Sequence, residues 1–289
     1  MWGSADKPAI LPKIKGSSIM VSDFIEEHNG YLRISTGELE DARRNDEDFP
    51  GRELFEYGAA REGYWTGEKF MAQIEKATKI AEYKYPPAMH TLVWLFDQSS
   101  CHRAYAPDAL NVNNMNVKPG GAQAVMRDTV WAGSIQRMVF NNGVAKGMKQ
   151  VLEERGINTQ TLKAPDMRMI LSNHEDFRTE KTIVEHYFTD RGHHVHFIPK
   201  FHCEMNPIER VWGQAKRYTR TYTNFTFPGL RKIMHDGLNS VTLDMIRKYF
   251  RKDRDYESAY REGLEAGKIV EQAVKIYKYH RRIFHKVVP

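Results

Sequence analysis

The amino-acid sequence predicts an α/β fold with a largely helical carboxyl-terminal third. An apolar run that ends in an acid, HTLVWLFD at residues 90–97, is typical of a buried strand. The segments on either side of it show the apolar spacing of amphipathic helices. An order in which helices alternate with buried strands is typical of α/β proteins.

The amino-terminal part predicts a hairpin, a loop and a helix. SIMVSDFI at residues 18–25 is a short apolar run, and Gly30 followed by YLRIS indicates a turn into a second strand. Residues 37–63 are rich in charged residues and glycine without periodicity, which predicts an irregular loop. A helix is expected between Thr66, a suitable cap, and Pro86. Its apolar stripe consists of Phe70, Ile74, Ala77 and Ile80.

The middle of the chain predicts one central strand, an insertion and a second strand. We expect the strand at residues 90–97 to be buried on both faces. Residues 103–142 hold many turn signals, including Pro119-Gly120-Gly121, and predict an irregular insertion. VAKGMKQVLEERG then predicts a helix that stops at Gly156, TEKTIVEHYFTDRG a second helix, and HHVHFIPK a strand.

Four helical patterns follow Pro207. They are PIERVWGQAKRYTR, FPGLRKIMHDGL, LDMIRKYFRK and a stretch over residues 256–282.

Composition sets limits on location and partners. With 41% hydrophobic and 28% charged residues, and no apolar run near the roughly 20 residues that cross a bilayer, a membrane location is not expected. The first residues lack a secretory signal and only two cysteines occur, which favours a nuclear or cytoplasmic location. Residues 201–289 contain 18 Lys or Arg against 10 Asp or Glu, which suggests a polyanion partner or a solvated basic surface.

Asp97 is the first candidate site residue. An acid at the carboxyl end of a central strand lies where open α/β sheets place their ligands. Asp97 can equally start a turn with Ser99 and Ser100. His102, five residues further on, could face the same site or be a surface side chain.

Glu209 is the second candidate, and it has two interpretations. Asn206 suits a helix N-cap, Pro207 the first helical position, and Glu209 the capping-box position. The other interpretation is a metal ligand, because a buried stripe (Ile208, Val211, Trp212 and Ala215) would fix the helix rigidly while cations line its exposed side. Two carboxylates about 4 Å apart repel by about 4 kcal/mol at an effective dielectric near 20, and a divalent ion such as Mg²⁺ or Mn²⁺ removes that conflict.

The motifs around these two acids resemble a known family. LFDQSSCH, followed much later by HFIPKFHCEMNPIERVWGQAKR, resembles the second and third acidic motifs of mariner-like DDE transposases, in the eukaryotic subgroup described as DDE superfamily endonucleases. The resemblance implies an RNase H-like mixed β-sheet flanked by helices and metal-dependent cleavage or strand transfer of DNA. It implies Mg²⁺ (or Mn²⁺) as cofactor, with Asp97 and Glu209 as catalytic metal ligands and His102 as a neighbour.

The sequence departs from that family in three ways. Gln98 stands where an Asn is usual, and the interval between the two acids implies an inserted module at about residues 103–180. The first acid of the family's triad would lie before Met1, which predicts an amino-terminally shortened relative with an incomplete site. Asp23 is then a candidate substitute for this acid.

The interpretation as a relative of this family divides the chain into a catalytic core at residues 1–222 and a basic helical extension at 223–289. The cations expected to bind DNA are Arg210, Lys216, Arg217, Arg220, Lys248, Arg251 and Lys252. A non-catalytic DNA-binding transposon remnant or domesticated protein is the alternative function, since basic residues interleave with aromatic ones in KRYTR and RKYFRKDR. A zinc site is a further alternative, from His194, His196, His202, Cys203 and Glu204.

Overall fold

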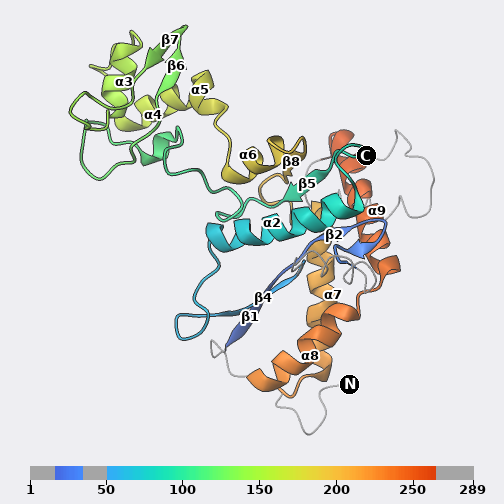
Figure 1. Cartoon of the computed structure of the whole chain (residues 1–289). Helices are drawn as coiled ribbons and strands as arrows, with labels where there is room; N and C mark the ends of the chain where they lie inside the picture. The colour runs from blue at the N-terminus through green and yellow to red at the C-terminus, as the bar shows by residue number, and fades with distance from the viewer. Residues whose placement is uncertain (1–16, 35–50, 265–289) are drawn as a thin grey trace. The chain divides into compact units, whose positions relative to one another are not determined.

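The computed structural model describes residues 17–34 and 51–264 of a mixed α/β chain (Figure 1). The chain forms two compact units. Of the described residues, the first unit contains those up to His90 and those from Phe197 onward, and the second unit spans Thr91–His196. The predicted partition into residues 1–222 and 223–289 stays a prediction. The end of the last predicted helix, residues 265–282, lies outside the described residues.

The first unit contains two pairs of short antiparallel strands. Strand β1 (Ser18–Ser22) pairs with β4 (Glu53–Tyr57), and β2 (Ile25–Glu26) pairs with β3 (Gly30–Tyr31). Its helices are α2 (Gly67–Lys84), α7 (Pro207–Tyr222), α8 (Phe227–Asn239) and α9 (Leu243–Arg261), with a 3-10 turn η2 (Cys203–Met205) before α7.

Two expectations for this unit were wrong in part. The hairpin exists only as the short β2–β3 pair, while β1 pairs with a segment more than thirty residues away. That segment, β4, lies inside the stretch predicted as a loop. Its sequence ELFEY is too short and too charged to stand out locally, and it is ordered by pairing Phe55 opposite Met20 and Leu54 opposite Val21.

The predicted helices of this unit are confirmed. Thr66 caps α2 by accepting a hydrogen bond from the Lys69 N–H, and the predicted apolar stripe is buried. Helices α7, α8 and α9 begin at the expected places, and α9 continues without a break to Arg261.

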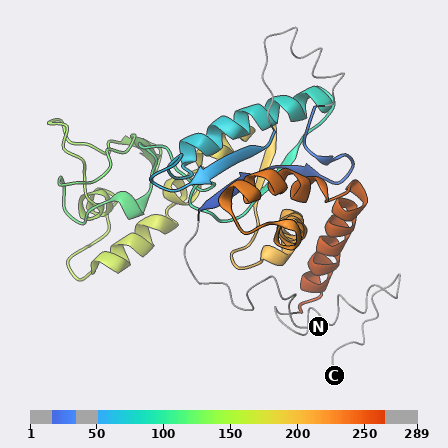
Figure 2. The same cartoon turned by 90° about the horizontal axis from the view of Figure 1, so that it is seen from below.

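The β1–β4 ribbon has a helix layer on each face (Figure 2). On one face, Ile19, Val21 and Leu54 pack against α7 and α8. On the other, Phe55 contacts Trp65, and Gln73 of α2 donates hydrogen bonds to the carbonyls of Ser22 and Gly51. This three-layer arrangement fixes α7, and α9 packs on α7 through a further cluster that includes Val211, Val241 and Ile246.

The second unit has its own elements. They are β5 (Val93–Phe96), η1 (Val112–Asn114), β6 (Thr129–Trp131), β7 (Ser134–Gln136), α3 (Met148–Glu154), α4 (Ala164–Asn173), α5 (Glu175–Arg178), α6 (Ile183–Thr189) and β8 (His194–Phe197). Strands β5 and β8 form one two-stranded sheet and β6 and β7 another.

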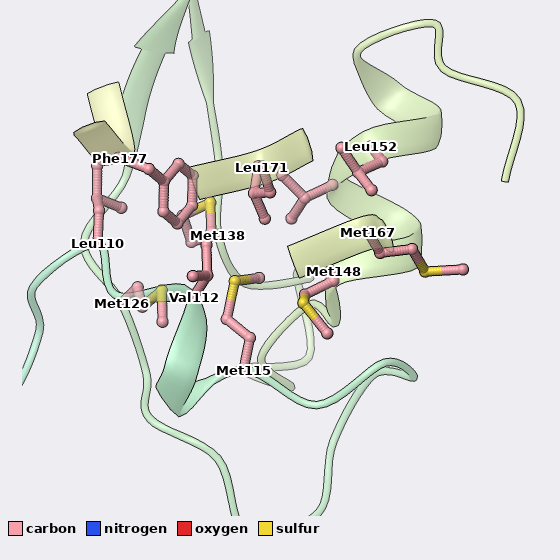
Figure 3. Close-up of a cluster of buried hydrophobic side chains, with 11 residues drawn as sticks. Leu110, Val112, Met115, Met126, Met138, Met148, Leu152, Met167, Leu171 and Phe177 are labelled. Atoms are coloured by element: carbon pink, nitrogen blue, oxygen red, sulfur yellow. The ribbon is translucent and has the colours of Figure 1, made fainter. Parts of the chain in front are cut away.

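A methionine-rich core holds much of this unit together (Figure 3). Five methionines contribute, and Val151, Leu152 and Leu171 at its centre are fully buried. Methionine fills irregular spaces well, which suits a core built between short helices and long connections. The methionines are Met115, Met126, Met138, Met148 and Met167.

Three expectations for the second unit need correction. The stretch predicted as irregular contains the β6–β7 hairpin, turned at Ala132 and Gly133 with φ values of 48° and 78°. Helix α4 was not expected at all. Strand β5 is not buried on both faces, because Val93 and Leu95 are exposed while Trp94 and Phe96 are buried. The stop of α3 at Gly156, with φ 79°, is confirmed.

None of the helices in the described part of the chain combines the length and the apolarity needed to cross a membrane.

Candidate functional site

Asp97 directly follows β5 and is held by two neighbours in the next turn. Its Oδ1 accepts a hydrogen bond of 2.9 Å from the Ser99 N–H, and Nδ1 of His102 lies 2.6 Å from the same oxygen. The turn interpretation is therefore confirmed, and of the two positions considered for His102 the structure shows the one beside Asp97. The contact with His102 is the main cause that lowers the pKa of Asp97, against the opposing effect of partial burial. The result is an ionised, half-exposed carboxylate.

An aromatic stack anchors the strand that carries Asp97. The ring of Trp94 stacks on Phe188 of α6 at 4.7 Å between centroids, and Phe96 lies 6.3 Å from the same ring. Phe96 also lies 5.4 Å from the ring of His102. The backbone N–H of Ile183 donates to the Ala104 carbonyl, so the loop after Asp97 is tied to the start of α6. Asp97 and His102 thus lie on a braced turn.

Glu209 lies in the first turn of α7, in the first unit. Asn206 caps the helix by accepting from the Ile208 N–H, as predicted. The capping box is not formed, because the Asn206 N–H donates to the Cys203 carbonyl instead. Glu209 is exposed, and its carboxylate has no hydrogen-bond or ion-pair partner among the described residues. Capping therefore does not account for this acid.

The exposed face of α7 continues from Glu209 in a regular stripe. Gly213, Lys216 and Arg220 follow at intervals of about one helical turn, and all are exposed. Open space surrounds the position of a Cβ at Gly213. The opposite face is anchored by Val211 and Ala215, which are buried. The stripe presents one acid and two cations on a fixed helix.

Asp23 lies just after β1 and is buried. Its Oδ2 accepts from Nε of Arg52 at 2.5 Å and its Oδ1 from the Phe24 N–H at 2.9 Å. Burial raises the pKa of Asp23, and Arg52 opposes that shift. Both carboxylate oxygens have protein partners, so the buried ion pair gives Asp23 a structural role. Its role as a substitute ligand stays a prediction.

Arg210, one of the cations expected to bind DNA, points inward. Its Nη1 contacts Oδ1 of Asp253 on α9, and its Nη2 donates to the Glu204 carbonyl at 2.7 Å. It thereby joins η2, α7 and α9. The sequence offers no signal for this pairing, because Asp253 lies 43 residues further along the chain.

The remaining predicted DNA-binding cations differ in exposure. Lys216, Arg217, Arg220, Lys248 and Arg251 are exposed, and Lys252 is half-buried with its Nζ 5.4 Å from the centroid of the Tyr256 ring. Arg217 also donates to Gln214 within its own helix. Their role in DNA binding stays a prediction.

The residues of the zinc alternative do not form a site. Nδ1 of His202 lies 2.8 Å from Oε1 of Glu204, which also accepts from the Tyr260 hydroxyl at 2.5 Å. His194 and His196 belong to the second unit. Among residues 17–34 and 51–264, no three His, Cys, Asp or Glu side chains come together in a way that could hold a metal ion.

The two acids of the predicted metal pair thus lie in different units, Asp97 in the second and Glu209 in the first. In donor type they suit a hard divalent cation: Asp97 is ionised and half-exposed, and Glu209 is an exposed carboxylate. Comparison of the chain with protein-family models, with curated proteins and with solved structures gives no match.

Proposed function

We propose that this protein acts on DNA as a mariner-like DDE enzyme with an RNase H-like core, in which Asp97 and Glu209 hold Mg²⁺ or Mn²⁺ for phosphodiester cleavage or strand transfer. The main support is Glu209. Its carboxylate is exposed and takes no part in capping α7, and buried residues on the opposite face fix the position of this helix. Its sequence setting, NPIERVWG, is the motif that carries the resemblance to this family.

Asp97 supports the proposal through its charge. Its carboxylate is kept ionised by His102 and the Ser99 N–H, which leaves it able to attract a divalent cation near neutral pH. A bound divalent ion would polarise the phosphodiester and lower the pKa of an attacking water. In this proposal the protein presents the two carboxylates, and Lys216 and Arg220 of α7 position the DNA strand.

Nicking of supercoiled plasmid DNA in Mg²⁺ or Mn²⁺ tests this function. Asp97→Asn and Glu209→Gln should each reduce nicking by at least about 100-fold, since loss of even an outer-shell partner costs about 10–100-fold. Asp108→Asn is the control for Asp97, because Asp108 is an exposed aspartate of the same unit. Glu68→Gln is the control for Glu209, because Glu68 is an exposed glutamate in the first turn of α2. Nicking that survives in both site variants would refute the assignment.

A third variant tests the incomplete triad. Asp23→Asn should leave nicking intact if Asp23 serves only its ion pair with Arg52. Loss of nicking with unchanged folding would instead make Asp23 the third ligand. Salt-sensitive DNA binding by the wild type without cleavage in either metal would favour the non-catalytic alternative. The exposed cations of α7 and α9 are the observation that supports this alternative.

A further inference from the structure

The free carboxylate of Glu209 depends on the shape of the η2 turn. Glu209 stands three residues after the N-cap Asn206, where a glutamate commonly accepts a hydrogen bond from the N-cap N–H. In this protein that N–H donates to the Cys203 carbonyl of η2 instead, at 3.1 Å. The geometry of η2 therefore removes the one backbone donor that would draw the Glu209 carboxylate back onto the end of its own helix.

The side chain of Glu204 attaches η2 to helix α9. Its Oε1 accepts a hydrogen bond of 2.5 Å from the hydroxyl of Tyr260, in the last turn of α9. Nδ1 of His202 lies 2.8 Å from the same oxygen. The rings of His202 and Tyr260 meet edge to face, with 5.1 Å between their centroids. A residue 56 positions further along the chain therefore holds the turn that precedes α7.

The electrostatics of this contact set its direction. Burial and the hydrogen bond to Glu204 raise the pKa of Tyr260, so its hydroxyl keeps the proton and donates it. Burial also opposes the ionisation of Glu204, but the contacts with Tyr260 and His202 outweigh burial and lower the pKa of Glu204. A hydrogen bond to an ionised acceptor is stronger than one between neutral groups. The attachment between η2 and α9 is therefore a strong one.

Arg210 attaches the backbone of the same turn. Its Nη2 donates to the Glu204 carbonyl at 2.7 Å, and its Nη1 contacts Asp253 of α9. The backbone and the side chain of Glu204 are thus both held. In this state η2 keeps the geometry in which the Cys203 carbonyl accepts the Asn206 N–H.

We propose that Glu204 and Tyr260 are positioning residues for Glu209, because they hold η2 in the shape that keeps the Glu209 carboxylate out of the capping box. If η2 were released, the Asn206 N–H would lose its acceptor, and Glu209 has the spacing to replace it. A metal ion would then compete with the helix end for one carboxylate. The inference rests on the proposed function for the metal ion alone, since the hydrogen bond of the Asn206 N–H concerns only the first unit.

Carbon-13 NMR of the Glu209 carboxyl in the full, metal-free chain tests this position. Glu204→Ala should shift the resonance, because the carboxylate then accepts the Asn206 N–H. Glu204→Gln removes the charge but keeps an oxygen that accepts from Tyr260, so the resonance should stay near its wild-type position. Tyr260→Phe is the milder variant and should shift the resonance in the same direction as Glu204→Ala. Tyr249→Phe is the control and should cause no shift, since Tyr249 is a half-buried tyrosine of the same helix.

Two results of this experiment would overturn the positioning role. One is an unchanged Glu209 resonance in both Glu204→Ala and Tyr260→Phe. The other is a shift in Glu204→Gln as large as that in Glu204→Ala, which would show that the resonance responds to the charge of Glu204 and not to its hydrogen bond.

Mn²⁺ binding, measured by electron paramagnetic resonance of the free ion, tests the consequence for the metal. Glu204→Ala should weaken Mn²⁺ binding about two- to thirtyfold, the range that corresponds to competition with one helix cap. In the nicking assay the Mn²⁺ concentration that gives half the maximal rate should rise by the same factor. The rate at saturating Mn²⁺ should stay near that of the wild type. A lower rate at saturating Mn²⁺ with an unchanged half-maximal concentration would contradict the proposal.

The outcome can be separated from that of the proposed function. A Glu209 resonance that depends on Glu204, in a protein that binds no Mn²⁺ and nicks nothing, would refute the metal site and leave the positioning of Glu209 standing. Nicking that depends on Asp97 and Glu209, together with an unchanged resonance in Glu204→Ala and Tyr260→Phe, would refute the positioning role and leave the proposed function standing.

Discussion

Nδ1 of His102 lies 2.6 Å from Oδ1 of Asp97, the acid that follows β5. This contact makes the largest contribution to the lowered pKa of Asp97, and the Ser99 N–H adds to it. An acid that begins a turn needs only the backbone contact. The additional histidine gives Asp97 a fixed orientation and a charge that persists at moderately acidic pH.

Replacing His102 should raise the pKa of Asp97 toward its ordinary value. In His102→Ala the carboxylate loses its strongest partner, so the acid limb of metal-dependent nicking should move to higher pH. Carbon-13 NMR of the Asp97 carboxyl through a pH titration measures the shift directly. His186→Ala, at an exposed histidine of α6, is the control and should leave the titration unchanged. An unaltered Asp97 titration in His102→Ala would show that the Ser99 N–H alone sets its charge.

Much of the site was predictable because its signals are local. Periodic apolar residues, together with the caps Thr66 and Asn206, predict α2 and α7 correctly. The strand before Asp97 follows from the apolar run at residues 90–97, whereas the spacing of five only made His102 a candidate neighbour of Asp97. These features depend on contacts between residues that are close together in the sequence.

The features that were missed depend on distant contacts. β4 is a strand because β1 pairs with it, and Arg210 turns inward because Asp253 lies opposite it on α9. The sequence VWLF could not show that one face of β5 is exposed, because a run of apolar residues does not indicate whether other elements pack on one face of a strand or on both. The capping box of Glu209 was a sound local expectation, and η2 displaced it by accepting the Asn206 N–H.

Gly213 should be a weak point in α7. Glycine in a helix interior costs about 1 kcal/mol relative to alanine, and open space surrounds its Cβ position. Gly213→Ala should therefore raise the free energy of unfolding by about 0.5–1 kcal/mol, measured by urea denaturation. Gly237→Ala is the contrasting variant, because a Cβ there would lie 2.9 Å from Cγ2 of Thr219 and should destabilise the protein. A loss of stability in Gly213→Ala would show that this face of α7 is occupied.

The second unit should depend on a buried ion pair. Nη1 and Nη2 of Arg155 donate to the two carboxylate oxygens of Asp176 at 3.0 and 2.6 Å, and the guanidinium lies over the Trp131 ring. The Arg155 side chain is 0% exposed. Removing one member of such a pair leaves a buried charge without a partner, so Arg155→Met should cost about 3–5 kcal/mol.

Hydrogen exchange of residues 110–177 in the full chain measures this loss of stability within the second unit.

Burial raises the pKa of Asp176, but the hydrogen bonds from Arg155 outweigh it and the pKa is lowered. The stability from this pair is therefore present above the ordinary pKa of an aspartate and is lost as pH falls through the lowered value. Lys149→Met removes an exposed cation of α3 and should have little effect. Equal protection in Arg155→Met and wild type would contradict the prediction.

Asp253 should make the first unit less stable as pH rises toward neutrality. Burial raises its pKa to about 7 despite the opposing charge of Arg210, and Glu257 adds to the increase. The folded protein therefore keeps this proton where the unfolded chain, with an ordinary aspartate, has released it. The contribution of Asp253 to the stability is then fully present below about pH 4 and declines as pH rises to about 7.

Asp253→Asn should remove this decline, because the amide resembles the protonated acid and does not titrate. Urea denaturation of the full chain at several pH values, followed by the fluorescence of Trp212 near α9, measures the slope for each variant. Asp244→Asn replaces an exposed aspartate in the first turn of the same helix and should keep the wild-type slope. A wild-type slope in Asp253→Asn would mean that the Arg210 ion pair holds Asp253 ionised throughout. Arg210 would then join η2, α7 and α9 with the same strength at every pH in this range.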